Sequence, residues 1–163
     1  MNPQLESILN DTEGRYLEAT EQSELIDFAN SLEDRLRAMR SVQQHESQVI
    51  KAAMESLWDE YPEMKTEHVD AYERGVRDMT LVLRYTALAM VRDSEAFLEQ
   101  KLLHWFKTIL EAFDMSEPVA FAYRCLRDEL QQAMPAEDFA LLDPFIERTC
   151  EILSPTPSTA AAE

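Results

Sequence analysis

Apolar residues return every three or four positions over most of the chain, which is the pattern of amphipathic helices with one buried face. The clearest stripe follows Thr20, which we expect to be a helix N-cap. It consists of Leu25, Phe28, Leu32, Leu36 and Met39. Helix-forming residues dominate and β-branched runs are absent, so the pattern predicts a long helix here and no strands elsewhere.

The same spacing predicts further helices, separated by turn residues. Besides the helix that starts near residue 20, we expect helices at about 3–9, 49–58, 68–91, 95–113, 117–133 and from 135 onward. Tyr61-Pro62 should end the helix at 49–58, and Ser116 should cap the one at 117–133. Pro144 should kink or restart the last helix, with Asp143 as its new cap. About seven helices without a heptad seam predict an all-α, globin-like stack.

The length and charge of the chain limit its organisation and its partners. A chain of 163 residues, 45% of them hydrophobic, suits one domain, which we expect at 1–153 with a flexible tail at 154–163. The formal net charge of −17 repels nucleic acid and anionic membrane surfaces. No apolar run approaches the roughly 18 residues of a membrane span. The first residues do not resemble a signal peptide, so we expect a cytoplasmic protein.

Few residues offer catalytic or metal chemistry. Cys125 and Cys150 form no disulfide framework and no Cys-x-x-Cys pair, and we interpret them as small buried thiols. His104 could ligate haem in a globin-like fold, which leaves a haem globin as a minor alternative. The acidic residues show no metal-ligand spacing. Nucleophile–base pairs and phosphate-binding glycine loops are absent from the sequence, so an enzyme is not expected.

The helix predicted at 68–91 has two unlike faces. Its core stripe consists of Val69, Tyr72, Val76, Met79, Leu83 and Met90. The opposite face mixes charged and apolar groups: Arg74, Arg77, Asp78, Leu81, Tyr85 and Leu88. A surface helix should be polar there, so this face is expected to meet a ligand or another subunit. The alternative is a solvated Arg74–Asp78 pair worth about 0.3–0.5 kcal/mol. Gly75, which costs about 1 kcal/mol against alanine in a helix, favours close approach of another group.

Three segments resemble the phycobiliproteins, the light-harvesting globins of cyanobacterial and red-algal phycobilisomes. Residues 75–84, Gly-Val-Arg-Asp-Met-Thr-Leu-Val-Leu-Arg, are similar to the family's Cys-x-Arg-Asp-x-x-Tyr-Tyr-Leu-Arg. Residues 11–17, Asp-Thr-Glu-Gly-Arg-Tyr-Leu, resemble its Asp-x-x-Gly-Arg-Phe/Tyr-Leu, and 145–154 resemble its last helix. The resemblance covers nearly the whole chain and implies a phycobiliprotein-type globin with an N-terminal helical extension.

The resemblance implies a binding site for a bilin, a linear tetrapyrrole. In the family, the Arg of Arg-Asp pairs with a bilin propionate and the Asp accepts hydrogen bonds from pyrrole nitrogens. These roles fall on Arg77 and Asp78, with Arg74 as a second propionate partner. A fixed carboxylate suits a cationic tetrapyrrole, and a guanidinium suits a carboxylate tail. Gly75, Leu81 and Tyr85 complete the expected site.

The chain departs from the family at the site itself. The cysteine that forms the thioether is Gly75, which has no side chain for covalent attachment, and the tyrosine pair is Leu81-Val82. Residues 67–71 also lack the glycine and asparagine common before the cysteine. The sequence is therefore closer to cysteine-less relatives, such as the globins associated with bilin biosynthesis. The resemblance thus implies noncovalent bilin binding.

The resemblance also implies an interface between two chains. The family uses an Asp before Gly-Arg and an Arg after Tyr-Tyr-Leu as a cross-subunit ion pair. Asp11 and Arg84 occupy those positions, and Arg15 and Tyr16 lie beside the first of them. We expect a homodimer, or a heterodimer with a phycobiliprotein-like chain. The alternative is that Asp11 and Arg84 are two unrelated surface charges.

Three functions remain open at this stage. The first is a non-enzymatic globin that binds bilin noncovalently, associated with bilin biosynthesis or phycobilisome light harvesting. The second is a chromophore-free structural or regulatory partner in phycobilisome assembly. The third is the haem globin. We expect the protein to reach the cytoplasmic face of thylakoids only through its partners.

Overall fold

The computed structural model describes residues 2–64 and 70–155, and every regular element in this part of the chain is helical. The elements are α1 (Pro3–Asp11), α2 (Ala19–Glu60), α4 (Ala71–Arg92), α5 (Glu95–Leu98), the π-helical turn η1 (Glu99–Leu103), α6 (His104–Ala112), α7 (Ser116–Ala133) and α8 (Ala136–Leu153). The prediction of an all-α protein is confirmed. Part of the predicted tail, residues 156–163, and the predicted helix start at His68 lie outside the described residues.

The long helix α2 corrects the prediction of two separate helices. The segment between the stripe ending at Met39 and the stripe starting at Val49 contains neither glycine nor proline, and it stays helical with Ser41 and Val42 buried. The helix also begins earlier than expected, with Glu18 and not Thr20 at the N-cap. Tertiary packing thus stabilises the helix across a segment whose apolar periodicity is weak.

Local hydrogen bonds explain the early start of α2. The backbone N–H of Glu18 donates to Oε2 of Glu21 at 2.8 Å, and the guanidinium of Arg15 holds both oxygens of the same carboxylate at 2.7 and 2.9 Å. A Glu three residues into a helix that accepts from the N-cap N–H is one half of a capping box. The arrangement ties the loop after α1 to the first turn of α2.

This arrangement predicts an acid-sensitive N-terminal extension. The hydrogen bond from Arg15 lowers the pKa of Glu21 from 4.5 to about 2, with the Glu18 N–H as the next cause. Because the folded-state pKa is the lower one, the stabilisation is present above pH 4.5 and is lost as the pH falls towards 2. We expect the protection factors of the amides at 15–22, which correct for the intrinsic pH dependence of exchange, to fall over that interval in the parent.

The matched variant is Glu21→Gln, which keeps the side-chain shape without the titrating group. Its protection factors at 15–22 should already be lower at neutral pH and should change little between pH 4.5 and 2. A parent whose protection factors in this segment stay constant across that interval would contradict the assignment.

The last two helices also differ from prediction at their caps. Met115, not Ser116, is the N-cap of α7, and α8 runs unbroken through Pro144. Pro144 and Ala140 are both exposed, so the carbonyl that lacks an N–H partner faces solvent. Asp143 accepts a hydrogen bond from Nε of Arg127 at 2.8 Å instead of capping a new helix.

The region predicted as one helix at 95–113 is helical to Ala112 but contains the π-turn η1. Ser94 caps its start, since the N–H of Phe97 donates to the Ser94 hydroxyl at 3.2 Å. Before it, Asp93 ends α4 in the left-handed conformation with φ of 53°. The extra residue of a π-turn shifts the helical register. The side chains of α6 after η1 therefore point in other directions around the helix axis than the pattern of α5 would give.

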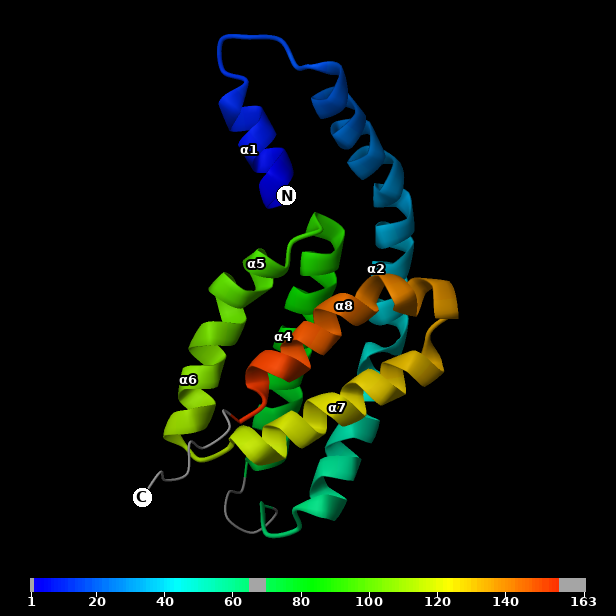
Figure 1. Cartoon of the computed structure of the whole chain (residues 1–163). Helices are drawn as coiled ribbons and strands as arrows, with labels where there is room; N and C mark the ends of the chain where they lie inside the picture. The colour runs from blue at the N-terminus through cyan, green and yellow to red at the C-terminus, as the bar shows by residue number, and fades with distance from the viewer. Residues whose placement is uncertain (1, 65–69, 156–163) are drawn as a thin grey trace, which may run out of the picture.

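The hydrophobic core lies around α4, where this helix packs against α2 and α8. α2 packs against α7 and α4, and α8 packs across α4 and α7 (Figure 1). Met79, Leu83 and Met90 of the predicted core stripe are buried, and Tyr72 and Val76 pack partly buried against them. α4 also buries Val82, Thr86 and Ala89 on a further side. The stripe is confirmed for its described members, and Val69 lies outside the described residues.

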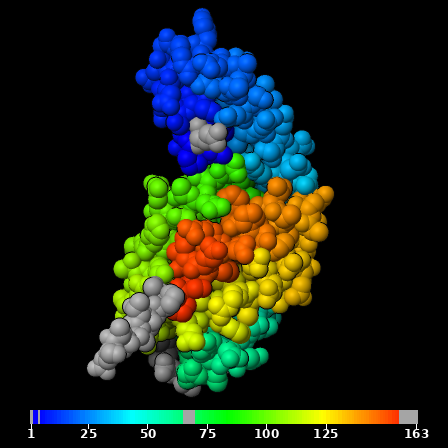
Figure 2. Space-filling model, in the orientation of Figure 1, coloured from blue at the N-terminus to red at the C-terminus, as the bar shows by residue number. Residues whose placement is uncertain are grey.

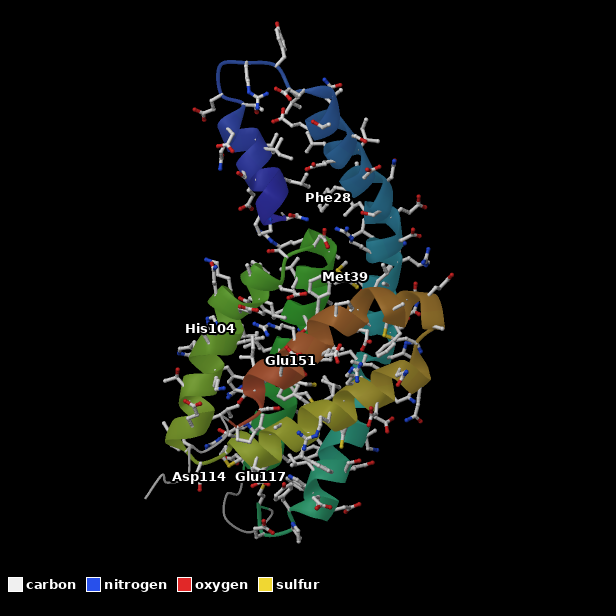
Figure 3. All side chains as sticks on the ribbon, viewed as in Figure 1. Phe28, Met39, His104, Asp114, Glu117 and Glu151 are labelled. Atoms are coloured by element: carbon white, nitrogen blue, oxygen red, sulfur yellow. The ribbon has the colours of Figure 1, made fainter. Side chains whose placement is uncertain are left out.

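The N-terminal helices extend beyond this core. α1 and the first turns of α2 form a hairpin that projects from the rest of the molecule (Figure 2). Phe28 on this part of α2 lies on the side of α1 (Figure 3). The guanidinium carbon of Arg35 lies over this ring, 5.0 Å from its centroid. The N-terminal helical extension implied by the family resemblance is therefore present.

Candidate ligand cavity

A cavity of about 380 Å³ opens between α2, α4, α6 and α7. Most of its wall is apolar: Met54, Leu57 and Trp58 come from α2, Phe106 and Leu110 from α6, and Val119 from α7. The volume falls in the range of about 300–1,000 Å³ that small-molecule pockets occupy. Such a wall suits a ligand with a large hydrophobic surface, and the few polar groups present then fix its orientation.

One edge of the cavity is formed by the predicted site on α4. Arg74, Gly75 and Asp78 all line it, because Asp78 lies three and four positions after the other two and residues at these spacings share a helix face. Nη2 of Arg74 lies 3.7 Å from Asp70, and Nε of Arg77 lies 3.1 Å from Oδ1 of Asp78. The alternative Arg74–Asp78 pair is not formed between these described residues. A cation and an anion therefore stand at the rim of an apolar cavity.

Gly75 allows a close approach from α2, as the sequence predicted for a glycine in the middle of a helix. A Cβ atom added at Gly75 would lie 2.6 Å from Cε and 3.1 Å from Sδ of Met54. Met54 is 2% exposed and lines the cavity beside Gly75. The group that approaches the glycine is thus a methionine side chain of the same protein.

Tyr123 of α7 is a polar group of the cavity wall that the sequence analysis missed. It lines the cavity and is 2% exposed. Burial raises the pKa of Tyr123 well above its ordinary value, and the negative charge of Asp78 raises it further. The hydroxyl is therefore protonated at neutral pH, and no described residue hydrogen-bonds to it. Its sequence context, Phe-Ala-Tyr-Arg, carries no signal beyond helical periodicity.

Other predicted site residues lie outside the cavity lining. Arg77 and Leu81 point to an exposed side of α4, and Tyr85 stacks on Phe97 with ring centroids 5.9 Å apart. The structure thus brings together Arg74, Gly75 and Asp78, whereas the ligand roles assigned to Arg77, Leu81 and Tyr85 stay predictions.

The remaining candidate ligands are also placed. His104 is exposed on α6 with Nε2 3.9 Å from Glu99 (Figure 3), and the described cavity wall contains no histidine. Cys125 and Cys150 are partly buried free thiols that do not line the cavity. Burial raises the pKa of Cys150 to about 11, so its thiol is a poor nucleophile at neutral pH. Among the described residues, no group of three or more His, Cys, Asp or Glu side chains is arranged to hold a metal ion.

Comparison with known proteins decides the family. The model of the phycobilisome protein family matches residues 8–153. The chain belongs to the phycobilisome protein family. Among curated relatives it is 30% identical to allophycocyanin subunit beta-18 of Pyropia yezoensis, covering 95% of this chain and 92% of that protein. It is 27% identical to the same subunit of Porphyra purpurea over 86% and 85% of the two chains. The R-phycocyanin beta chain of Polysiphonia urceolata is 24% identical, with 72% of each chain covered.

The comparison confirms the resemblance inferred from the sequence motifs. It also supports the interpretation of the fold as that of a phycobilisome globin with an N-terminal extension. Within residues 2–64 and 70–155, none of the helices has the length and apolar composition that crossing a membrane requires.

The two residues of the predicted cross-subunit ion pair have partners within the chain. Both Nε and Nη2 of Arg84 bond to Glu46, at 2.9 and 2.7 Å. Asp11 accepts a hydrogen bond from the Ser7 hydroxyl at 3.0 Å. Tyr16, at the tip of the N-terminal hairpin, is 97% exposed. The cross-subunit Asp11–Arg84 pair stays a prediction.

Proposed function

We propose that this phycobilisome-family globin binds a bilin noncovalently in the cavity edged by Arg74, Gly75 and Asp78. The observation that carries the proposal is the position of Asp78, an acidic group at the rim of a mostly apolar cavity of about 380 Å³. The described residues that line the cavity include no nucleophile paired with a base, and we propose a non-enzymatic protein. Its place would be cytoplasmic, in bilin biosynthesis or phycobilisome light harvesting.

The chemistry of the cavity fits a linear tetrapyrrole. Such a molecule presents wide apolar faces, propionate tails and a row of pyrrole N–H groups. The apolar wall suits the faces, and the carboxylate of Asp78 can accept from the N–H donors. Arg74 at the rim suits a propionate, and Arg77 provides a second guanidinium on the exposed side of the same helix. The protonated hydroxyl of Tyr123 adds a hydrogen-bond donor within the wall.

The noncovalent mode rests on the absence of a usable thiol. Gly75 replaces the family's attachment cysteine, and neither Cys125 nor Cys150 lines the cavity. We therefore expect complete release of bilin on denaturation. Protein loaded with bilin and denatured in acid urea should show no zinc-fluorescent band on a gel. A fluorescent protein band would contradict this mode and direct attention to Cys125 or Cys150.

A second candidate function, a structural partner in phycobilisome assembly, is favoured by exposed apolar side chains. Leu9, Tyr16 and Ile26 on the N-terminal hairpin and Leu81 and Leu88 on α4 are all exposed. Exposed apolar side chains of this kind can be covered by a partner chain. The names of the relatives, subunits of allophycocyanin and phycocyanin, agree with assembly into an oligomer. This function requires no ligand, and binding measurements therefore separate it from the first.

The interface makes its own prediction. Arg84→Glu should prevent the proposed pairing with Asp11 of a second chain and shift sedimentation towards monomer. The matched control is Glu46→Gln, which removes the intrachain partner of Arg84 but leaves the guanidinium, so its sedimentation should equal that of the parent. Sedimentation velocity at low protein concentration provides the measurement. An unchanged coefficient for Arg84→Glu, with circular dichroism showing an intact fold, would count against the interface.

A further inference from the structure

Gly75 is not required by the backbone of α4. Positive φ angles in the described chain belong to Gly14, Asp93 and Asp114, and Gly75 is not among them. In an ordinary helical conformation alanine would be about 1 kcal/mol more favourable than glycine. The reason for glycine must therefore be spatial, and among the described residues the close groups from outside its own helix are the sulfur and terminal methyl of Met54.

The contact between Met54 and Gly75 fills the place of a side chain at position 75. A Cβ atom there would come within 2.6 Å of the Met54 methyl carbon, closer than two carbon atoms approach without contact repulsion. Met54 is almost fully buried and lines the same cavity as Gly75 and Asp78. The thioether of Met54 from α2 therefore occupies the space through which a side chain at position 75 would reach a ligand.

We infer that Met54 is a specificity-determining residue of the bilin site. Its side chain adapts the site to a bilin that is held by packing and not by a covalent bond. This inference rests on the proposed function. The unbranched, polarisable thioether of methionine packs well against conjugated ring systems. Its position over Gly75 sets the depth of the cavity beside Asp78. Glycine at 75 and methionine at 54 thus act as a pair, because the missing side chain at 75 leaves room for the thioether of Met54.

The Gly75→Ala substitution tests the pair without disrupting the fold. The atoms that a Cβ at 75 would meet are the far end of a flexible side chain, so Gly75→Ala is accommodated when Met54 turns away. The free space beside both residues is the cavity, so the displaced thioether occupies ligand volume. Met54→Ala removes the thioether, and the double variant places a methyl group where the thioether was.

The experiment is a double-mutant cycle on the full chain with biliverdin as the probe, followed by absorbance titration. Gly75→Ala should weaken binding about tenfold, and Met54→Ala should shift the red absorption maximum, because the ring system loses its contact with sulfur. The double variant should bind within about threefold of the Met54→Ala protein, so that the effect of Gly75→Ala disappears once Met54 is absent. Met115→Ala, which changes another methionine of the cavity wall, should leave the tenfold effect of Gly75→Ala intact.

The outcomes separate this inference from the proposed function. If the parent binds no biliverdin at micromolar concentrations, the proposed function fails. If the parent binds but the two substitutions have additive effects on affinity, the role of Met54 is overturned. It is also overturned if the coupling appears only in the urea unfolding midpoint of the ligand-free protein, with affinity and absorption maximum unchanged.

Discussion

Asp78→Asn is expected to lower bilin affinity about tenfold to a hundredfold. The substitution keeps the size and shape of the side chain but removes the charge that stabilises a protonated tetrapyrrole, and charge-assisted hydrogen bonds contribute about 1.5–3 kcal/mol. The red absorption band should also broaden and lose intensity, because the protonated, extended form becomes less favoured. Absorbance titration of the purified variant measures both effects.

Arg77→Gln provides the comparison on the same helix. It removes the guanidinium that pairs with Asp78 at 3.1 Å, and it should weaken binding with little change in the spectrum, because a propionate lies outside the conjugated system. Neither variant should alter folding, since both side chains lie away from the buried stripe of Met79 and Leu83. If both variants bind bilin like the parent, the assignment of Asp78 is wrong.

Tyr123→Ala is expected to cause the largest loss of stability among the cavity substitutions. The ring is 2% exposed and packs in the core between α7 and its neighbours. Removing a buried aromatic ring typically lowers the free energy of unfolding by about 3–5 kcal/mol. Urea denaturation of the ligand-free protein should show a lower midpoint with an unchanged slope.

Tyr123→Phe is the matched control, because it removes only the hydroxyl. That hydroxyl has no hydrogen-bond partner among the described residues, so its loss should change the free energy of unfolding by less than about 1 kcal/mol. A loss as large as that of Tyr123→Ala would show that the hydroxyl stabilises the ligand-free fold. The assignment of the hydroxyl to the cavity would then be wrong.

The sequence predicted the fold class because its helical periodicity is strong and its family motifs keep their spacing. It predicted helix boundaries less well where local rules compete with packing. The segment between Met39 and Val49 has a weak stripe but no helix breaker, and tertiary contacts make it part of α2. Pro144 remains inside α8 because the carbonyl it leaves unpaired is on the exposed side, which a local rule for proline does not consider.

The candidate site was predictable only where it lies on one helix. Helix geometry alone places Arg74, Gly75 and Asp78 on a common face, and the structure shows that face at the cavity edge. Met54 and Tyr123 come from α2 and α7, and no spacing along the chain connects them with α4. Gly75 carried the one usable signal, since an otherwise costly glycine indicated that another group approaches the helix there.

The most direct test of noncovalent bilin binding is one absorption spectrum of the protein purified from cells that produce both haem and bilin. We expect a bilin band in the visible region, with an intensity of at most one bilin per chain, and release of this bilin from the protein in acid urea. A Soret band would identify a haem globin instead. A colourless protein would contradict ligand binding and leave the structural partner in phycobilisome assembly as the function.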